Sequence, residues 1–151
     1  MRKFAESIKE RINPNVFITL TVRQGITNDR GVYIAGDREV YDRVMVGLYK
    51  STGRRLSKGR QKRKMIENLS TVERGIFKRN HIHSCARIPD GVTFEEFRDA
   101  LIASWERSKW SLPLHDIQIV TGNAVNYIVK EGQESLLLSA TYAPILADSA
   151  P

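Results

Sequence analysis

Two closely spaced histidines are the residues of this chain best suited to bind a metal ion. His81 and His83 are one residue apart in the stretch "NHIHSCARI" (residues 80–88), and the chain contains 3 histidines in all. In a β-strand alternate residues lie on the same face, so both imidazoles would project from one side of a sheet and can converge on one metal ion. A pair of surface histidines without a function is the alternative, because the H-x-H pattern is short.

Glu73 is the candidate for a third ligand, since it lies eight residues before His81. If the chain turns near Phe77 and forms a hairpin, Glu73 comes opposite His81 on the partner strand. Two imidazoles and one carboxylate would leave coordination positions open for water or substrate. Such a site favours Mg²⁺ or Mn²⁺ in use, although imidazole also binds Zn²⁺.

A tyrosine and a lysine form a second candidate pair. In "NYIVKEG" (residues 126–132), Tyr127 and Lys130 are three residues apart and would share one face of a helix, with Asn123 one turn earlier. A phenol beside an ammonium group is a candidate nucleophile with a positive charge nearby. The alternative is a partly buried tyrosine next to a solvated lysine.

The charge of the chain favours a polyanionic partner, most often nucleic acid. The formal net charge is +7, and residues 50–64 contain eight Lys or Arg and no acidic residue. Gly53 and Gly59 lie within this stretch, so we expect a helix to end there and a mobile basic loop to follow. Instead of binding nucleic acid, residues 50–64 could be a solvated loop or a localisation signal. The net charge could likewise belong to a basic domain that is merely soluble.

Length and composition bound the class of protein. The 151 residues, of which 41% are hydrophobic, suit one domain with a real core. The single cysteine, Cys85, excludes an intramolecular disulfide and favours a reducing compartment. No stretch reaches the ~20 apolar residues that a membrane helix needs, and the first residues lack the apolar region of a signal peptide. We therefore expect an intracellular protein that does not enter a membrane.

Strands and helices must position these residues. Residues 15–23 predict a strand with one apolar and one polar face, namely Val16, Ile18, Leu20 and Val22 against Phe17, Thr19, Thr21 and Arg23. We also predict strands over residues 32–34, 64–74, 78–88 and 116–120, and helices over residues 2–12, 40–49, 93–105 and 123–132. The stretch "GITNDRG" (residues 25–31) predicts a turn or loop, and Pro113 should end the region after the third helix.

The strand over residues 78–88 would have an apolar side facing the helices and an open basic side. That open side would carry the two histidines together with Arg79, Cys85 and Arg87. The order of elements predicts an α+β domain, in which an antiparallel sheet has its helices packed on one face.

Three of these stretches occur in an order that resembles a known family. "FITLT" (residues 17–21), Glu73 with "HIH" (residues 81–83), and "YIVK" (residues 127–130) look like the three motifs of HUH-type replication initiators. These are the Rep endonucleases of rolling-circle plasmids, phages and small circular single-stranded DNA viruses. The resemblance covers about residues 15–132. Each motif alone is unspecific, whereas their joint order with the upstream glutamate is specific.

The resemblance implies a fold and a role for each motif. The fold would be a five-stranded antiparallel sheet flanked by helices, similar to ferredoxin-like and RRM folds, over residues 1–135. Residues 136–151 would form a C-terminal extension with a last strand and a flexible tail. The metal would be held by His81, His83 and Glu73. Tyr127 would be the nucleophile, with Lys130 holding a phosphate or assisting it. The first motif would form scaffold or contact DNA through Phe17, Thr19 and Thr21.

The activity that the resemblance implies is nicking and joining of single-stranded DNA at a replication origin. Tyr127 would form a 5′-phosphotyrosine and release a 3′-hydroxyl, which primes rolling-circle replication. Basic side chains of the open sheet face and of the basic segment would contact the phosphates, namely Arg23, Arg54, Arg55, Arg60, Lys62, Arg63, Arg79 and Arg87.

The order of the motifs indicates which HUH endonucleases the chain resembles most. The tyrosine follows the histidines, as in Rep proteins, whereas it precedes them in mobilisation relaxases. No second tyrosine lies one helical turn from Tyr127, so the chain resembles the single-tyrosine class. No P-loop pattern is present, so either a separate helicase acts with it or a helicase domain belongs to a longer chain.

The resemblance also implies an oligomeric state and a cellular location, and it leaves two other functions open. We expect a monomer or weak dimer in the cytoplasm of the host, or in the nucleus of a eukaryotic host. The alternatives are a single-tyrosine HUH transposase and a non-catalytic module that binds single-stranded DNA or RNA, in which Phe17 would stack on bases.

Overall fold

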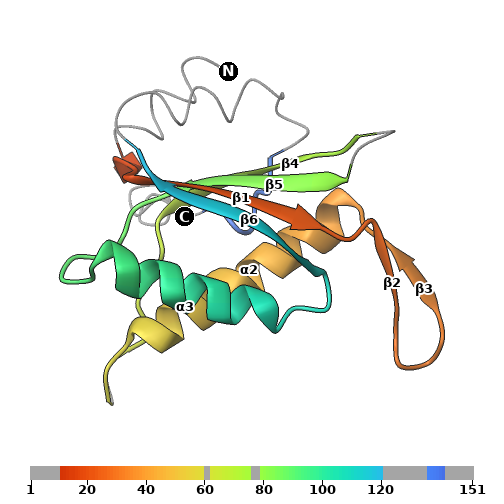
Figure 1. The fold of residues 1–151 in the computed structure, drawn as a ribbon, viewed down its shortest axis with the longest axis horizontal. Coiled ribbons are helices and arrows are strands. Elements are labelled where there is room, and N and C mark those ends of the chain that lie inside the picture. The colour runs from red at the N-terminus through yellow and green to blue at the C-terminus, as the bar shows by residue number, and fades with distance from the viewer. Residues whose placement is uncertain (1–10, 60–61, 76–78, 121–135, 142–151) are drawn as a thin grey trace, which may run out of the picture.

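The described part of the chain forms an α+β arrangement with the helices on one side of the main sheet (Figure 1). The computed structural model describes residues 11–59, 62–75, 79–120 and 136–141. In chain order the helices and strands are β1 (Val16–Val22), β2 (Gly25–Thr27), β3 (Tyr33–Ala35), α2 (Arg38–Leu56), β4 (Asn68–Glu73), β5 (Asn80–Ala86), α3 (Phe94–Glu106) and β6 (Ser111–Ile119). None of the described helices is long and apolar enough to cross a membrane.

The main sheet has the strand order β4-β5-β1-β6, and each neighbouring pair is antiparallel. The α+β class and the antiparallel sheet were predicted correctly, but the described sheet has four strands and not five. Residues 136–151 were expected to add a strand, and the described part of them, residues 136–141, contributes an isolated bridge between Leu136 and Thr71 at the outer edge of β4. Residues 25–31, expected to be a loop, begin a separate hairpin of β2 and β3.

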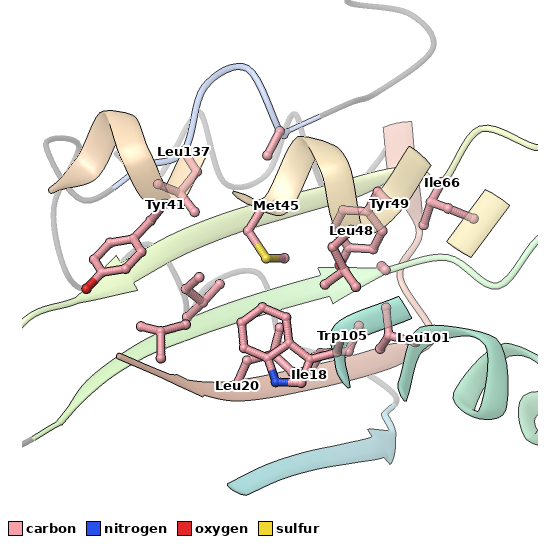
Figure 2. Close-up of a cluster of buried hydrophobic side chains, with 14 of the residues drawn as sticks. Ile18, Leu20, Tyr41, Met45, Leu48, Tyr49, Ile66, Leu101, Trp105 and Leu137 are labelled. Atoms are coloured by element: carbon pink, nitrogen blue, oxygen red, sulfur yellow. The ribbon is translucent and has the colours of Figure 1, made fainter. Parts of the chain in front are cut away.

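The alternation of β1 explains how the sheet packs. Its four predicted apolar residues are all at most 1% exposed and lie against α2 and α3. Figure 2 shows Ile18 and Leu20 of this strand in one buried cluster with Tyr41 and Met45 of α2 and Trp105 of α3. Burial of large apolar side chains on this one face holds the helices to the sheet.

Helix α2 extends farther than the sequence indicated. We expected the glycines of the basic segment to break it, but it continues through Gly53 to Leu56. Gly53 is buried where the chain returns at Lys64, whose backbone N–H donates to the Gly53 carbonyl at 3.3 Å. The glycine therefore permits a close backbone approach instead of ending the helix. The first half of the predicted mobile basic loop is thus helix.

Helix α3 begins where its local signal predicts, whereas β6 departs from its prediction. Thr93 and Glu96 form the predicted capping box at the start of α3, with hydrogen bonds of 3.1 Å in both directions. Strand β6 is longer than predicted and contains Pro113, which we expected to end the preceding region. Because β6 is an edge strand, proline removes no hydrogen bond that the sheet needs there.

Residues 136–141 pack onto the helix and the edge strand. Leu137 is fully buried, and its backbone N–H donates to the Ser70 carbonyl at 2.8 Å. The carboxylate of Asp42 in α2 accepts from the backbone N–H groups of Ser139 and Ala140 at 3.0 and 2.8 Å. The start of the predicted C-terminal extension is therefore tied to the core.

The two glycines of α2 predict opposite effects of the same substitution. At Gly53 an added methyl group would clash with the Lys64 carbonyl oxygen, whereas at Gly47 it would meet nothing within 4 Å. We expect Gly53→Ala to lower the free energy of unfolding by about 1–3 kcal/mol. The control Gly47→Ala should raise it by about 1 kcal/mol through helix propensity. Urea titration followed by circular dichroism measures both, and equal effects would show that the backbones do not approach closely at Gly53.

Candidate functional site

The candidate site is the polar side of the main sheet, opposite α2 and α3. The register places Thr21, His81 and Glu73 in one row across β1, β5 and β4. The next row consists of Thr19, His83 and Thr71, and it continues to Asp116 in β6. The hairpin prediction that set Glu73 opposite His81 is therefore confirmed.

Both histidines are held by hydroxyl groups of β1. Thr21 Oγ1 lies 3.2 Å from His81 Nδ1, and Thr19 Oγ1 lies 3.4 Å from His83 Nδ1. Although Glu73 stands opposite His81, its Oε2 reaches diagonally to His83 Nε2 at 3.0 Å. His83 is thus anchored at both nitrogens, by a threonine on one side and a carboxylate on the other.

Thr19 and Thr21, the threonines of the first motif, therefore hold the histidine rings through hydrogen bonds to Nδ1. A hydroxyl group both donates and accepts, so it can bind either protonation state of Nδ1. In metal sites the second ring nitrogen of a histidine ligand is usually fixed in this way, which orients the ring and leaves Nε2 for the metal. The sequence motif left the role of Thr19 and Thr21 open between scaffold and DNA contact. Only the cross-strand register pairs them with the histidines.

The side chains on this face are of the types that bind a divalent cation, but they are not arranged around one point. Two imidazoles and one carboxylate are suitable ligands. However, no group of three or more His, Cys, Asp or Glu side chains within the described ranges is placed to hold a metal ion. The two imidazole centroids are 6.3 Å apart, and Glu73 is engaged directly with His83. Metal binding would have to replace this hydrogen bond.

This face is less open than the strand pattern suggested. Cys85 and Thr71 are 0% and 1% exposed, and the His83 side chain is 13% exposed. Phe17 stacks on His83 with ring centroids 6.0 Å apart and an angle of 28° between the planes. The expectation that Cys85 lies on an open face was therefore wrong. The histidines stand in a partly enclosed position.

The predicted phosphate partners do not gather at one place. Arg23 and Arg79 are exposed at the same end of the sheet, because Val22 pairs with Asn80. Arg87 instead lies 3.3 Å from the Asn13 carbonyl and 3.6 Å from Asp90. It is therefore engaged with the protein itself.

The basic segment lies away from the histidines. Arg54 and Arg55 belong to the last turn of α2, on the opposite side of the sheet (Figure 1). Lys62 and Arg63 follow at the end of that helix, and Arg60 lies outside the described residues. Tyr127 and Lys130, which carry the predicted chemistry, are also outside them. That Tyr127 and Lys130 lie close to the histidines stays a prediction.

Comparisons with known proteins identify no relative of this chain. No protein-family model matches it, and no curated protein or solved structure matches it either. A functional conclusion therefore depends on the residues of the sheet face and on the sequence motifs that they belong to.

Cys85 provides a test of how well this face is covered. Burial raises the pKa of its thiol to about 12, so the reactive thiolate is scarce in the folded protein at neutral pH. We expect a thiol reagent such as Ellman's to leave Cys85 unmodified in the native protein at pH 8. Modification should become complete within the same time in urea. Rapid reaction of the native protein would show that the face opens at this strand.

Proposed function

We propose that this protein cuts and rejoins single-stranded DNA, with Tyr127 as the nucleophile and with His81, His83 and Glu73 binding a divalent cation. The observation that carries the proposal is the pairing of the first two motifs across β1 and β5. Each histidine is held at Nδ1 by a threonine of the first motif, and Glu73 lies against Nε2 of His83. The hydroxyl group at Nδ1 is the kind of partner that orients a histidine ligand, and a bound cation would replace the contact between Glu73 and Nε2.

The described residues on either side of Tyr127 are placed compatibly with its role as the nucleophile. Ile119 is the last residue of β6 at one edge of the sheet, and Leu136 bridges to Thr71 at the opposite edge. Measured across the sheet alone, these positions are separated by four strand spacings of about 4.8 Å, or roughly 19 Å. Tyr127 stands near the middle of the intervening sequence. The proposal requires that this segment pass over the histidine face, because α2 and α3 occupy the other one.

The proposed reaction conserves a phosphodiester bond. The phenol oxygen of Tyr127 attacks phosphorus, the bond from phosphorus to the 3′ oxygen breaks, and the leaving oxygen takes a proton to become a 3′-hydroxyl. Since a phenol has a pKa of about 10, a nearby cation such as Lys130 favours the ionised form and stabilises developing charge. A divalent cation, when bound, would polarise the phosphate. Attack of a 3′-hydroxyl on the adduct reverses the reaction and joins strands.

Two other tyrosines are poor candidates for the nucleophile. Burial raises the pKa of both Tyr41 and Tyr49, and both pack against the helix side of the sheet. The Tyr49 hydroxyl is bound to Ser84, and the Tyr41 hydroxyl donates to the Arg23 carbonyl at 2.8 Å. Tyr33 is exposed on β3 and serves as a control.

A second candidate function is a non-catalytic module for single-stranded nucleic acid. It is favoured by Phe17, which is half-buried on the histidine face and stacks on His83. Aromatic side chains on a sheet are a common platform for unpaired bases. Formation of a covalent adduct separates this candidate from the nicking enzyme.

We expect Tyr127→Phe to abolish cleavage and leave DNA affinity nearly unchanged, because only the nucleophilic oxygen is lost. A denaturing gel with labelled single-stranded oligonucleotides and Mn²⁺ should show a slowly migrating protein–DNA adduct for the wild type and for Tyr33→Phe. Two oligonucleotides of different length that share the nick site should also yield a recombinant strand. Adduct formation by Tyr127→Phe would contradict the assignment, and a free 5′-phosphate without adduct would indicate a hydrolytic nuclease.

We expect the histidines to control binding of Mn²⁺. Paramagnetic resonance should show that His81→Ala and His83→Ala weaken Mn²⁺ binding by at least tenfold. Glu73→Ala should have a smaller effect because its carboxylate must first give up the hydrogen bond to His83, and Thr19→Val because the hydroxyl orients a ligand without being one. His115→Ala is the matched control, because this histidine is exposed on β6 and points away from Thr19. Equal Mn²⁺ affinity of all five variants would remove the metal from the proposal.

A further inference from the structure

A groove between α2 and α3 lies on the side of the molecule away from the histidines. Its volume is about 390 Å³. From α2 it is lined by Arg43, Gly47 and Ser51, which are spaced four residues apart and share one face of the helix. From the end of α3 and the residues after it come Ser104, Arg107 and Ser108.

The groove is positively charged and contains no built-in counter-ion. Within the described residues, no Asp or Glu lines it, and no carboxylate lies within 4.0 Å of Arg43 or Arg107. Arg55 adds a third guanidinium, because its Nε donates to Ser104 Oγ at 3.1 Å beside the groove. Two arginines and three serines thus line the groove together with Val44 and Leu48, Arg55 lies beside it, and none of the described lining residues is acidic.

We propose that this groove binds the phosphate backbone of a DNA duplex, as a second nucleic-acid site apart from the histidine face. Arginine and serine side chains are the usual partners of backbone phosphates. Gly47 removes the side chain from the floor of the groove, so that a phosphate can approach the helix closely. Arg54 near the end of α2 and Lys58 just after this helix are exposed and extend the positive surface beyond the groove.

The lining of the groove favours a duplex over a single strand. Sites for single strands combine positive charge with aromatic platforms on which bases stack. The described lining of this groove has no aromatic side chain. The tryptophan of α3, Trp105, is 1% exposed and belongs to the core. Recognition is therefore limited to phosphates, which a duplex presents on its outer surface.

Substitutions at Gly47 test the groove with little risk to the fold. A side chain there points into open space, so Glu, Gln and Lys should all be accommodated. Fluorescence anisotropy in EDTA, with a short labelled duplex of arbitrary sequence, should rank the affinities as Gly47→Lys above Gly47→Gln above Gly47→Glu. Equal duplex affinity of the three variants would overturn the proposal.

Removal of the arginines gives a quantitative test. The double variant Arg43→Gln, Arg107→Gln should reduce the slope of log affinity against log salt for the duplex by about 1.8, which corresponds to two phosphate contacts. The matched control is Arg30→Gln, Arg98→Gln, which removes the same charge from positions outside the groove and should change the slope far less. The same slope in both double variants would indicate only a general charge effect and would overturn the site.

The single strand of the same length distinguishes the two modes of binding. Its affinity should fall no more in the arginine variant than in the control. An equal loss for single strand and duplex would contradict the assignment to a duplex. Because these are binding measurements without metal, their failure would leave the proposed nicking reaction untouched. Adduct formation by Tyr127→Phe, which would contradict the nicking assignment, would in turn leave the groove untouched.

Discussion

The antiparallel register of β1 against β5 is the constraint on which the candidate site depends. It pairs Thr19 with His83 and Thr21 with His81, and both hydroxyl–imidazole contacts follow from it. The same register sends Ile18 and Leu20 into the core, where each large aliphatic side chain contributes roughly 1.5–3 kcal/mol. A slip by one residue would turn every side chain to the other face. The apolar core thereby keeps the polar pairs aligned.

The sheet separates two kinds of surface. On one side the histidines stand in a partly enclosed polar position, where Glu73 and the threonines bind them. On the other side the helices cover the core and present arginines to solvent. If both proposed sites bind nucleic acid, one part of it would meet the histidine face while another part is held at the groove by charge alone.

Buried polar groups on the core side tie the end of the described chain to the sheet. Ser70 Oγ lies 2.7 Å from both Ser84 Oγ and Asn68 Oδ1, and Asn68 Nδ2 donates to the Ala140 carbonyl at 2.9 Å. Buried polar groups are costly unless they are paired, so this network favours one placement of residues 136–141 over others. That placement fixes one end of the segment with Tyr127 at the edge of β4.

Local patterns in the sequence determined much of this protein. The alternation over residues 15–23 predicted the two faces of β1, and Thr93 with Glu96 predicted the start of α3, because each depends only on neighbouring residues. The hairpin between β4 and β5 brought Glu73 opposite His81 for the same reason. Tertiary structure decided what depends on distant residues. Gly53 continues α2 because the backbone of Lys64 packs against it, Cys85 is buried despite its place on a polar strand face, and Glu73 binds His83 instead of its direct partner. The arginines of the groove, Arg43 and Arg107, are 64 residues apart and meet only because two helices pack on the same face of the sheet.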